Sequence, residues 1–477
     1  MNFTEVLDKH TVFQVTAQVA QRLGVATYVV GGFVRDLLLE RPSKDIDLVC
    51  VGNGIQLAQA VAEALKQLPG RTTEVSVFKN FGTAMVKHNE YELEFVGARK
   101  ESYRADSRKP EVAPGTLEDD QRRRDFTINA LAISLNANDY GALVDPFDGV
   151  GDLRRKMIVT PLDANITFSD DPLRMMRAVR FATQLTFDID PDTFDAIIDN
   201  AERLKIISQE RITDELNKII LSPVPSYGFK LLFHAQLLQQ FFPDMVNLQG
   251  VEKIDGKSHK DNFYHTLQVL DNVAQVSDDL WLRWAAILHD IAKPATKRFH
   301  PKAGWSFHGH EDKGARMVPS LFRKLKLPMD QKMKFVQTLV RLHLRPIALV
   351  KDVVTDSAVR RLLYEAGDTI DALMMLCRAD ITSKNHERVA RYLRNFDKVE
   401  QKMEEVEAKD QLRNFQPAIT GEDIMRTFNL SPSRVVGEIK NEIREAILEG
   451  HVENTRESSY QYMLQIAQDR GLQPVED

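Results

Sequence analysis

Residues 28–36 read Tyr-Val-Val-Gly-Gly-Phe-Val-Arg-Asp, and residues 44–47 read Lys-Asp-Ile-Asp. Glycines at the end of an apolar strand let the backbone approach a phosphate chain, and the N-terminus of the following helix favours anions. Asp45 and Asp47 are two residues apart on the next expected strand, so their side chains point to the same face. Paired carboxylates together with substrate phosphates are typical ligands of Mg²⁺. The stretch therefore predicts a site for phosphoryl or nucleotidyl transfer.

A third carboxylate is expected on a neighbouring strand. Residues 91–97 read Tyr-Glu-Leu-Glu-Phe-Val-Gly, which makes Glu94 either a third acid of the site or an exposed strand residue. Taken singly, a Gly-Gly pair is typical of a turn, and an Asp-x-Asp is typical of a solvated strand end. Their combination in strand-turn-helix-strand order resembles the nucleotidyltransferase fold that is shared with DNA polymerase beta.

The composition limits the class of protein. At 477 residues, with 43% hydrophobic and 28% charged residues, the chain is typical of a globular protein with two to four domains. No apolar run approaches the roughly 20 residues of a membrane span, and the first residues lack the regions of a signal peptide. The two cysteines imply no disulfide framework. We therefore expect a cytoplasmic protein with no membrane partner. A net charge of −6 excludes coating of nucleic acid by bulk charge, but local basic clusters still allow a nucleic-acid partner.

The first basic cluster is the run Asp-Asp-Gln-Arg-Arg-Arg-Asp at residues 119–125. Arginine forks match phosphate oxygens, and an adjoining acid can orient them or bond a ribose hydroxyl. The plainer alternative is a solvated run of charges. Apolar residues alternate with small ones immediately after the run, at residues 126–133, which indicates that it adjoins buried structure.

The second basic cluster follows an expected helix start at Asp171-Pro172. Arg174, Arg177 and Arg180 recur every three residues and so form one stripe on that helix. Either Asp171 only caps the helix and the arginines are solvated, or the stripe faces a nucleotide or an RNA backbone. The nearby glycine and aspartate motifs favour the second interpretation.

Together these motifs resemble class II tRNA nucleotidyltransferases, the CCA-adding enzymes, in the family that also contains bacterial poly(A) polymerases. The matching segments are GGFVRD with DID, RRRDFTINA, DDPLRMMRAVRF and ISQERITDE, which span residues 28 to about 220. A weaker match is ITGEDIM at residues 419–425. One departure is that Asp170 stands where the family usually has glutamate, which leaves the next acid and the following arginine in place.

The resemblance implies a role for each matching residue. Asp45 and Asp47 would hold two Mg²⁺ ions, with Glu94 as the possible third catalytic acid. Gly31, Gly32 and Arg35 would contact the phosphates, with Arg124 nearby, and Asp125 and Asn129 would lie close to the sugar. Asp171 and Arg174 would read the base edge, Arg177 and Arg180 would line the same pocket, and Glu210 and Arg211 would brace the base-reading helix.

The chemistry of an acid–arginine pair accounts for base selection. A carboxylate accepts from an exocyclic amine, and a guanidinium donates to a ring nitrogen or carbonyl. ATP and CTP carry such an amine, whereas GTP and UTP carry a carbonyl at that position, so Asp171 and Arg174 would select A and C without a template. Residues 103–117 are rich in Pro, Gly and charge, which predicts a mobile loop. In the resembled family a loop in this region helps to switch from C to A addition.

A second constellation of metal-binding residue types lies downstream in helical sequence. It consists of His265, His289, Asp290 and Asp380, with His310 and His343 as a possible second metal pair. Histidines and carboxylates spread over several helices suit a transition metal or Mg²⁺. The order His…His-Asp…Asp resembles the HD phosphohydrolase superfamily, which implies phosphatase or phosphodiesterase activity on RNA ends or cyclic nucleotides. The alternative is a helical domain that keeps its ligands but serves as an RNA platform.

The sequence thus predicts an α+β chain in four parts. These are a polymerase-beta-like nucleotidyltransferase head at 1–151, a helical RNA-binding neck at 152–250, an HD-type domain at 251–400 and a helical tail at 401–477. A loop at residues 250–260 is expected to separate the neck from the HD-type domain. The expected function is Mg²⁺-dependent CCA addition to tRNA from CTP and ATP. Poly(A) polymerase, CC- or A-adding activity, an HD hydrolase as the main activity, and a silent RNA-binding protein stay as alternatives. The oligomeric state and the identity of the HD metal are left open.

Overall fold

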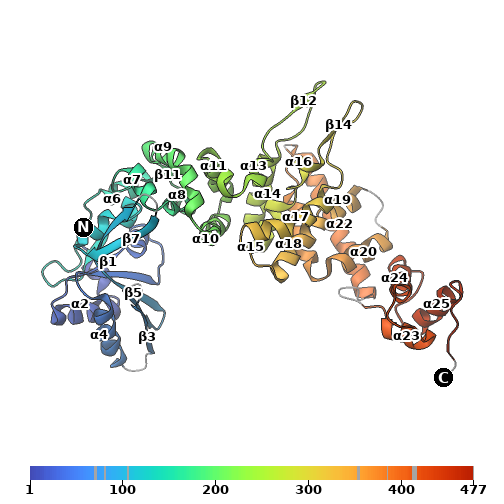
Figure 1. The fold of residues 1–477 in the computed structure, drawn as a ribbon, viewed down its shortest axis with the longest axis horizontal. Coiled ribbons are helices and arrows are strands. Elements are labelled where there is room, and N and C mark those ends of the chain that lie inside the picture. The colour runs from blue at the N-terminus through green and yellow to red at the C-terminus, as the bar shows by residue number, and fades with distance from the viewer. Residues whose placement is uncertain are drawn as a thin grey trace. The chain divides into compact units, whose positions relative to one another are not determined.

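The computed structural model describes residues 1–68, 72–79, 82–104, 107–351, 355–383, 385–410 and 416–475. Within this range the chain forms two compact units, Met1–Pro243 and Asp244–Asp477. The first contains the main β-sheet and a group of helices, and the second is almost entirely helical (Figure 1). The predicted α+β fold class with a sheet-containing head is therefore confirmed. The finer division at residues 151, 250 and 400 stays a prediction.

A seven-stranded sheet is the centre of the first unit, in the order β3-β4-β5-β2-β1-β8-β9. The strands are β1 (Thr27–Val30), β2 (Asp45–Cys50), β3 (Thr73–Phe78), β4 (Thr83–His88), β5 (Tyr91–Gly97), β8 (Ala132–Ser134) and β9 (Leu143–Val144). Only β2 and β5 pair in parallel. Helix α4 (Gly54–Lys66) packs against β3, β4 and β5 with its apolar face. One face of the β3–β5 part of the sheet is thereby covered, and β2 and β5, which carry the acids, are adjacent.

The expected loop at residues 103–117 is largely a β-hairpin. Strands β6 (Arg99–Arg104) and β7 (Ser107–Pro114) pair antiparallel, from Arg99 opposite Pro114 to Arg104 opposite Ser107. They form a two-stranded sheet separate from the main one, so both strands have a free edge among the described residues. Proline is compatible with an edge strand, where its missing N–H does not interrupt a ladder. The prolines therefore do not exclude strand structure here, and the loop prediction was wrong for this segment.

Helices follow the sheet in the first unit. They include α5 (Leu117–Arg122), α7 (Ala164–Asp170), α8 (Leu173–Leu185) and α10 (Gln209–Ile220). Helix α8 begins where expected, because Asp171 Oδ1 accepts a hydrogen bond from the Leu173 N–H at 3.1 Å. Its methionines and Val179 are buried, and α10 packs beside it. The apolar side of α8 is thus fixed, which leaves the arginine stripe on the other side.

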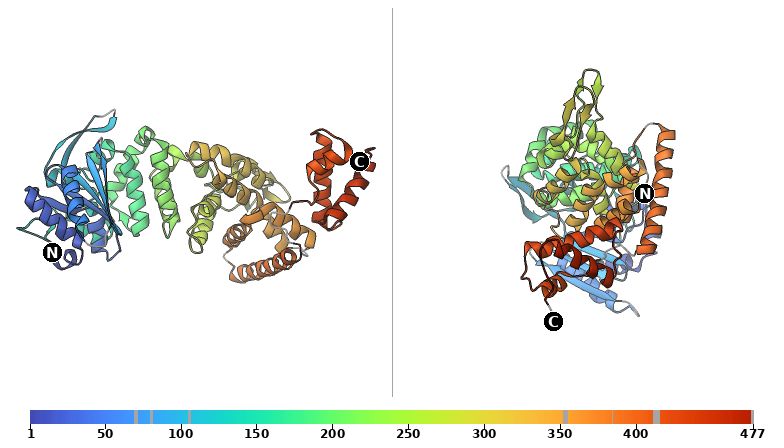
Figure 2. Two further views of the ribbon diagram at one scale, coloured as in Figure 1. Left: turned by 90° about the horizontal axis from the view of Figure 1, so that it is seen from below. Right: turned by 90° about the vertical axis from the view of Figure 1, so that its right-hand side faces the viewer.

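The second unit is a helical bundle that carries two hairpins. Its helices include α14 (Asn262–Ala274), α15 (Leu280–Leu288), α17 (His310–Lys324), α18 (Gln331–Leu342), α21 (Ile370–Ala379), α22 (His386–Asp410), α23 (Gly421–Phe428), α24 (Arg434–Glu449) and α25 (Arg456–Gln468). Helix α22 is the long orange helix of Figure 2. None of the described helices has the length and apolar character required to cross a bilayer.

The two hairpins of the second unit protrude side by side (Figures 1 and 2). One is β12 (Lys253–Ile254) with β13 (Lys257–Ser258), and the other is β14 (Arg298–His300) with β15 (Gly304–Ser306). Residues 250–260 were expected to be a plain loop between domains. Asp255 and Gly256 both have positive φ, as a two-residue hairpin turn requires. The Asp-Gly pair is a hairpin signal that the sequence reasoning missed.

Candidate active site and metal centre

Three carboxylates of the first unit lie on one face of the sheet. In the parallel pairing of β2 and β5, Asp47 stands opposite Glu94, and Asp45 lies two residues before Asp47. Burial raises the pKa of Asp47, against the lowering effect of Arg124, and Asp45 raises it further. Burial and the proximity of Asp47 likewise raise the pKa of Glu94. Such a cluster repels itself, so a divalent cation would stabilise it.

The glycine turn stands directly beside these acids. Gly31 has φ +71°, and a Cβ atom there would lie 3.0 Å from Arg124 Nη1 and 3.2 Å from Asp47 Oδ2. Any other residue would be strained by the backbone and crowded by both side chains. Helix α3 (Gly32–Leu38) begins at the next residue. The turn thus brings backbone, acid and arginine within reach of one bound group.

A buried acid holds two of the three consecutive arginines. Asp120 is 0% exposed, and its carboxylate accepts hydrogen bonds from Arg123 and Arg124. The Arg124 Nη2 and Nε atoms lie 3.0 and 3.1 Å from Asp120 Oδ2. The sequence analysis did not assign Asp120 a role, although its spacing of four residues from Arg124 is that of a helical ion pair. Asp120 therefore fixes the guanidinium beside the glycine turn.

Asp125 and Asn129 connect this turn to helix α8. Asp125 Oδ2 accepts from Arg177 Nε at 2.7 Å, and Asp125 Oδ1 accepts from Asn129 Nδ2 at 3.1 Å. Arg35 Nη1 donates to Asn129 Oδ1 at 2.9 Å. Burial alone would raise the pKa of Asp125, but Arg177 and the hydrogen bond from Asn129 hold it below its usual value. Asp125 is therefore ionised and engaged with the protein.

Two arginines of α8 and Arg35 of α3 surround one aromatic ring. The guanidinium carbons of Arg180, Arg35 and Arg177 lie 4.2, 5.1 and 5.3 Å from the centroid of the Phe181 ring. Three like charges around one ring need compensating acids, and Glu215 Oε2 lies 2.7 Å from Arg180 Nε. Phe181 and Glu215 both lie in the matching segments, but neither was assigned a role in the site. No local pattern reveals the pairing of Glu215 with Arg180, because Glu215 is on α10, 35 residues along the chain.

The expected bracing residue on α10 is different from the one in the structure. Glu210 is exposed, whereas Glu215, just over one helical turn later, is buried and pairs with Arg180. Arg174 Nη2 donates to the backbone carbonyl of Arg123 at 2.7 Å. This bond links the start of α8 to the arginine run at residues 122–124. Asp171, just before α8, therefore lies near that run. Glu215 therefore makes an ion pair between α10 and α8, whereas the bracing role had been expected of Glu210 and Arg211.

All of these side chains line one cleft of about 930 Å³. Every catalytic and nucleotide-binding residue that the sequence predicted in the first unit lines it, namely Gly31, Gly32, Arg35, Asp45, Asp47, Glu94, Arg124, Asp125, Asn129, Asp171, Arg174, Arg177 and Arg180. The cleft also contains Arg211, Asp214 and Lys218 of α10. It combines an acidic face at the sheet with a basic face at the helices. That combination suits a triphosphate whose charges are shared between metal ions and guanidinium groups.

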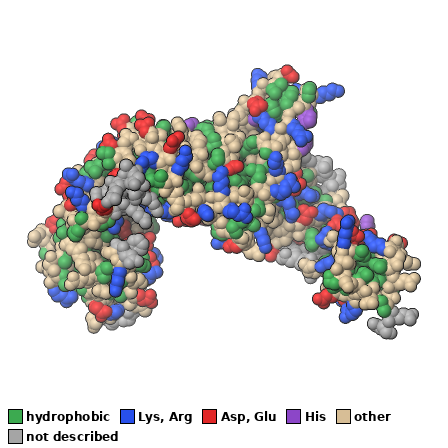
Figure 3. Space-filling view, viewed as in Figure 1, with side chains coloured by type: hydrophobic (Ala, Val, Ile, Leu, Met, Phe, Trp, Pro, Cys, Tyr) green, Lys and Arg blue, Asp and Glu red, His purple; other side chains and the backbone are tan. Residues whose placement is uncertain are grey.

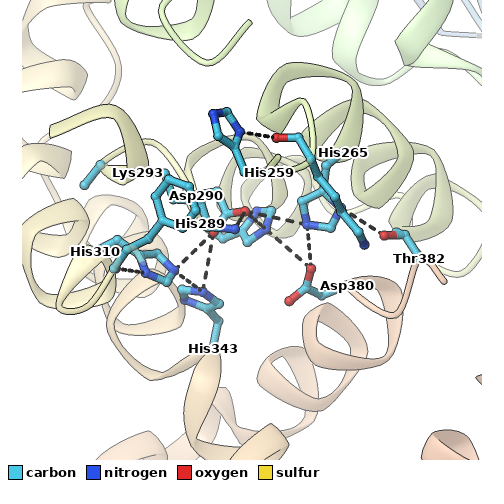
Figure 4. A network of polar contacts seen from close by, with 12 residues as sticks. His259, His265, His289, Asp290, Lys293, His310, His343, Asp380 and Thr382 are labelled. Carbon is cyan, nitrogen blue, oxygen red and sulfur yellow. Dashed lines mark hydrogen bonds and ion pairs between the residues drawn. The ribbon is translucent and has the colours of Figure 1, made fainter. Parts of the chain in front are cut away.

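The six metal-type residues of the second unit converge at one place (Figure 4). Two groups have the spacing of metal ligands: His265, His289 and Asp290 form one, and Asp290, His310 and His343 form the other. Asp290 belongs to both. Its Oδ2 lies 3.3 Å from His289 Nε2, and its Oδ1 lies 3.2 Å from His310 Nε2. Asp380 Oδ1 lies 2.9 Å from His265 Nε2 and so adjoins the first group.

The histidine tautomers are consistent with metal binding. The Nδ1 atoms of His289, His310 and His343 lie 2.7–2.8 Å from backbone carbonyls, which require an N–H there. Their Nε2 atoms therefore carry lone pairs in the neutral form, yet His310 Nε2 and His343 Nε2 are only 3.3 Å apart. His289 Nε2 is buried without a hydrogen-bond partner. Lone pairs aimed at one another need a cation between them.

Electrostatics also favour a cation at this centre. Burial lowers the pKa of His289, but Asp290 and Asp380 overcome that effect and raise it to about 10. The pKa of His343 is lowered to about 4 by burial and by the adjacent His289. The carboxylates thus stabilise a positive charge beside them, whereas His343 does not readily take up a proton. A divalent ion would satisfy both groups.

A second cleft, of about 870 Å³, opens beside the metal centre. His265 and Asp380 line it, together with Thr382, whose Oγ1 lies 2.9 Å from His265 Nδ1. Among the residues described around this cleft, His310 and His343 are not part of the lining. A ligand in the cleft would therefore meet the first metal group.

Fold and site together define a nucleotidyltransferase joined to an HD-type domain, and comparisons with known proteins agree. The family described as "Poly A polymerase head domain" matches residues 27–159. "Probable RNA and SrmB- binding site of polymerase A" matches residues 186–248, and "HD domain" matches residues 262–385. These families are metal-dependent in their head and HD parts, which fits the two acidic centres described above.

Curated relatives cover most of the chain. The A-adding tRNA nucleotidyltransferase of Deinococcus radiodurans is 33% identical over 359 residues, which are 72% of this chain and 78% of the relative. The Multifunctional CCA protein of Nitrosococcus oceani is 32% identical over 380 residues, 75% of this chain and 85% of the relative. The solved CCA-adding enzyme of Bacillus stearothermophilus in complex with CTP is 25% identical, with a TM-score of 0.67 and 98% coverage of both chains. The chain belongs to the tRNA nucleotidyltransferase family.

Proposed function

We propose that this protein adds the CCA end to tRNA, one nucleotide at a time, from CTP and ATP in the cytoplasm. The observation that carries the proposal is the cleft of the first unit. In it the Asp47–Glu94 acidic face, the Gly31 turn and the Asp171/Arg174 pair line one space. The names of the relatives support the same substrates, since they include a tRNA nucleotidyltransferase, CCA proteins and a complex with CTP.

In this proposal Asp45 and Asp47 hold Mg²⁺, which would activate the RNA 3′-hydroxyl and neutralise the triphosphate. The residues of the chain do the positioning. Arg124, held by Asp120, receives the phosphates together with Arg35 and the backbone at Gly31, while Asn129 and Asp125 adjoin the sugar. The Asp171 carboxylate and the Arg174 guanidinium present an acceptor and a donor to the base edge. A base with an exocyclic amine next to a ring acceptor forms hydrogen bonds with both the carboxylate and the guanidinium. A base with a carbonyl in place of the amine would be repelled by the carboxylate.

The nearest alternative is a specialist that adds only A or only CC, because one relative is named A-adding. Transcripts of one tRNA that end before the CCA, after one C, after CC and after CCA separate these activities. Each transcript is incubated with CTP alone, ATP alone or both. Full CCA synthesis on the shortest transcript supports the proposal. Extension only of the CC-ending transcript identifies an A-adding enzyme, and long A tails identify a poly(A) polymerase.

We propose a second activity for the HD centre, namely metal-dependent hydrolysis of phosphate esters at RNA ends or in cyclic nucleotides. The Nε2 atoms of His310 and His343 lie 3.3 Å apart, and Asp290 Oδ1 lies next to His310 Nε2. This arrangement favours a bound divalent ion over a purely structural centre. The ion could be a transition metal or Mg²⁺. Two reactions test this activity with each metal in turn: the opening of 2′,3′-cyclic nucleotides to nucleoside monophosphates, and the release of phosphate from 3′-phosphorylated RNA. The absence of both reactions with every metal would leave the RNA-platform alternative.

A further inference from the structure

The two hairpins of the second unit form one basic structure, which we call the two-hairpin arm (residues 251–260 and 297–308). The arm contains six Lys or Arg residues against two acids, and also three histidines, in a chain whose net charge is −6. Figure 3 shows Lys, Arg and His side chains over the protruding hairpins. The charge of the arm is therefore opposite in sign to that of the whole protein.

The hairpins are fixed to each other by specific contacts. Lys257 Nζ donates to the carbonyls of Pro301 and Lys302 at 2.6 and 2.9 Å, and Trp305 Nε1 donates to the Lys257 carbonyl at 3.2 Å. Lys297 lies 2.7 Å from Glu252 and packs over the Trp305 ring at 4.6 Å. A single short hairpin is only marginally stable in water, so this mutual locking is what keeps the arm in shape.

The other four cations of the arm are directed to solvent. Lys253, Lys260, Arg298 and Lys302 are exposed, and in the described part of the chain no carboxylate lies within ion-pair distance of any of them. Exposed cations without acidic partners, held on a fixed scaffold, are what a polyanion neutralises on binding. Lys257 and Lys297 thus hold the two hairpins together, whereas the four exposed cations are available to a ligand.

The base of the arm is attached to the metal centre. Phe307, directly after β15, accepts a hydrogen bond from His310 Nδ1 at 2.8 Å through its carbonyl. The Phe307 ring lies 5.7 Å from Lys293 Nζ and 5.7 Å from the His259 ring. Lys293 Nζ in turn lies 2.5 Å from Asp290 Oδ2. An RNA chain that lies along the arm would therefore reach the rim of the HD centre.

We infer that the two-hairpin arm binds an RNA backbone and directs an RNA end to the HD centre. The destination rests on the proposed hydrolase function, whereas the binding itself does not. The partner is a phosphodiester polyanion, contacted through the exposed cations and without base-specific hydrogen bonds. Sequence-independent contacts of this kind make affinity fall steeply with salt.

The test compares RNA affinity of the full chain at several salt concentrations. The arm variant is Lys253→Ala, Arg298→Ala and Lys302→Ala, and the control is Arg316→Ala, Arg323→Ala and Lys334→Ala, which removes equal exposed charge from α17 and α18. We expect the slope of log affinity against log salt to become shallower by about 2 in the arm variant, since each lost contact removes roughly 0.7–0.9. The control should keep the wild-type slope, and so should the charge-retaining variant Lys253→Arg with Lys302→Arg. An unchanged slope in the arm variant would overturn the inference.

Two further readouts separate the remaining interpretations. Binding to phosphatidylglycerol vesicles that is lost in the arm variant, with RNA affinity intact, would identify a lipid surface and overturn the inference. For hydrolysis, the arm variant should raise KM for an RNA substrate at least tenfold and leave KM for a cyclic mononucleotide unchanged. An unchanged KM for RNA contradicts delivery to the HD centre. If no substrate is hydrolysed, the hydrolase proposal fails, while the salt slope still decides whether the arm binds RNA.

Discussion

Asp47 stands directly opposite Glu94 across the only parallel strand pair of the main sheet. Burial raises the pKa of both acids, and Asp47 adds to the shift at Glu94, so a cation beside them would be stabilising. The pairing places Glu94 at the site, which the sequence had left as one of two options.

Replacement of Glu94 by Gln should lower nucleotide incorporation about tenfold, which corresponds to ~1.4 kcal/mol of barrier. The reason is that a third acid beside Asp47 helps to hold Mg²⁺, so the Mg²⁺ concentration for half-maximal rate should rise as well. Incorporation of labelled CTP over a Mg²⁺ titration measures both effects. Glu90→Gln, at an exposed position in the turn directly before β5, is the matched control. If the Glu94 variant keeps the wild-type incorporation rate and the wild-type Mg²⁺ dependence, Glu94 is an exposed strand residue with no part in catalysis.

Replacement of Arg174 by Lys should weaken base selection. Arg174 is held by the Arg123 carbonyl at 2.7 Å, and a lysine retains the charge but loses the fork that can donate to two acceptors. We expect the preference for CTP over UTP to fall roughly 10- to 100-fold, the equivalent of ~1–3 kcal/mol. The ratio of kcat/KM for the two nucleotides is the measurement. A similar fall in kcat/KM for both, with the ratio intact, would mean that Arg174 binds phosphate and does not read the base.

Replacement of Asp125 by Asn should destabilise the first unit, because it leaves the half-buried Arg177 without its charged partner. The expected loss is about 1–3 kcal/mol in the free energy of unfolding. The folded pKa of Asp125 is lowered, so its contribution is complete above the unfolded pKa of roughly 3.9 and is lost as the pH falls through the folded value. The difference between wild type and variant should therefore be full at pH 7 and shrink below about pH 4.

Hydrogen exchange in residues 119–134 and 173–185 reports this unit separately from the rest of the chain. Arg177→Met is the companion variant, and the double variant should lose less than the sum of the two single losses. A difference in stability that stays constant down to pH 3 would show that the Asp125–Arg177 pair does not stabilise the fold as an ion pair.

Metal content should depend on which HD residue is changed. Because Asp290 contributes one oxygen to each group, Asp290→Ala should abolish binding of both ions, whereas His343→Ala should remove only one. Plasma mass spectrometry of desalted protein gives the stoichiometry, and Asp47→Asn in the first unit should leave it unchanged. If His343→Ala keeps the wild-type stoichiometry, the second group is not a metal site.

The sequence predicted the parts of the site that depend on short spacings. The Gly31 turn, the Asp45/Asp47 pair and the α8 arginines all follow from periodicity or from known turn chemistry, and all line the cleft. Glu215 could not be found in this way, because its pairing with Arg180 depends on how α10 packs against α8. Local signals were also misread. The Asp255-Gly256 turn and the edge strand β7 were taken for loops because their glycines and prolines outweighed the strand pattern.

The central claim is that Asp45 and Asp47 jointly hold the metal that drives nucleotidyl transfer. Asp47→Asn retains the size of the side chain and removes one negative charge, so we predict a loss of at least about a thousandfold in CTP and ATP incorporation into truncated tRNA. HD metal content and tRNA affinity should stay at wild-type values. The direct measurement is single-turnover incorporation of labelled CTP with saturating Mg²⁺. A rate within tenfold of wild type would contradict the account.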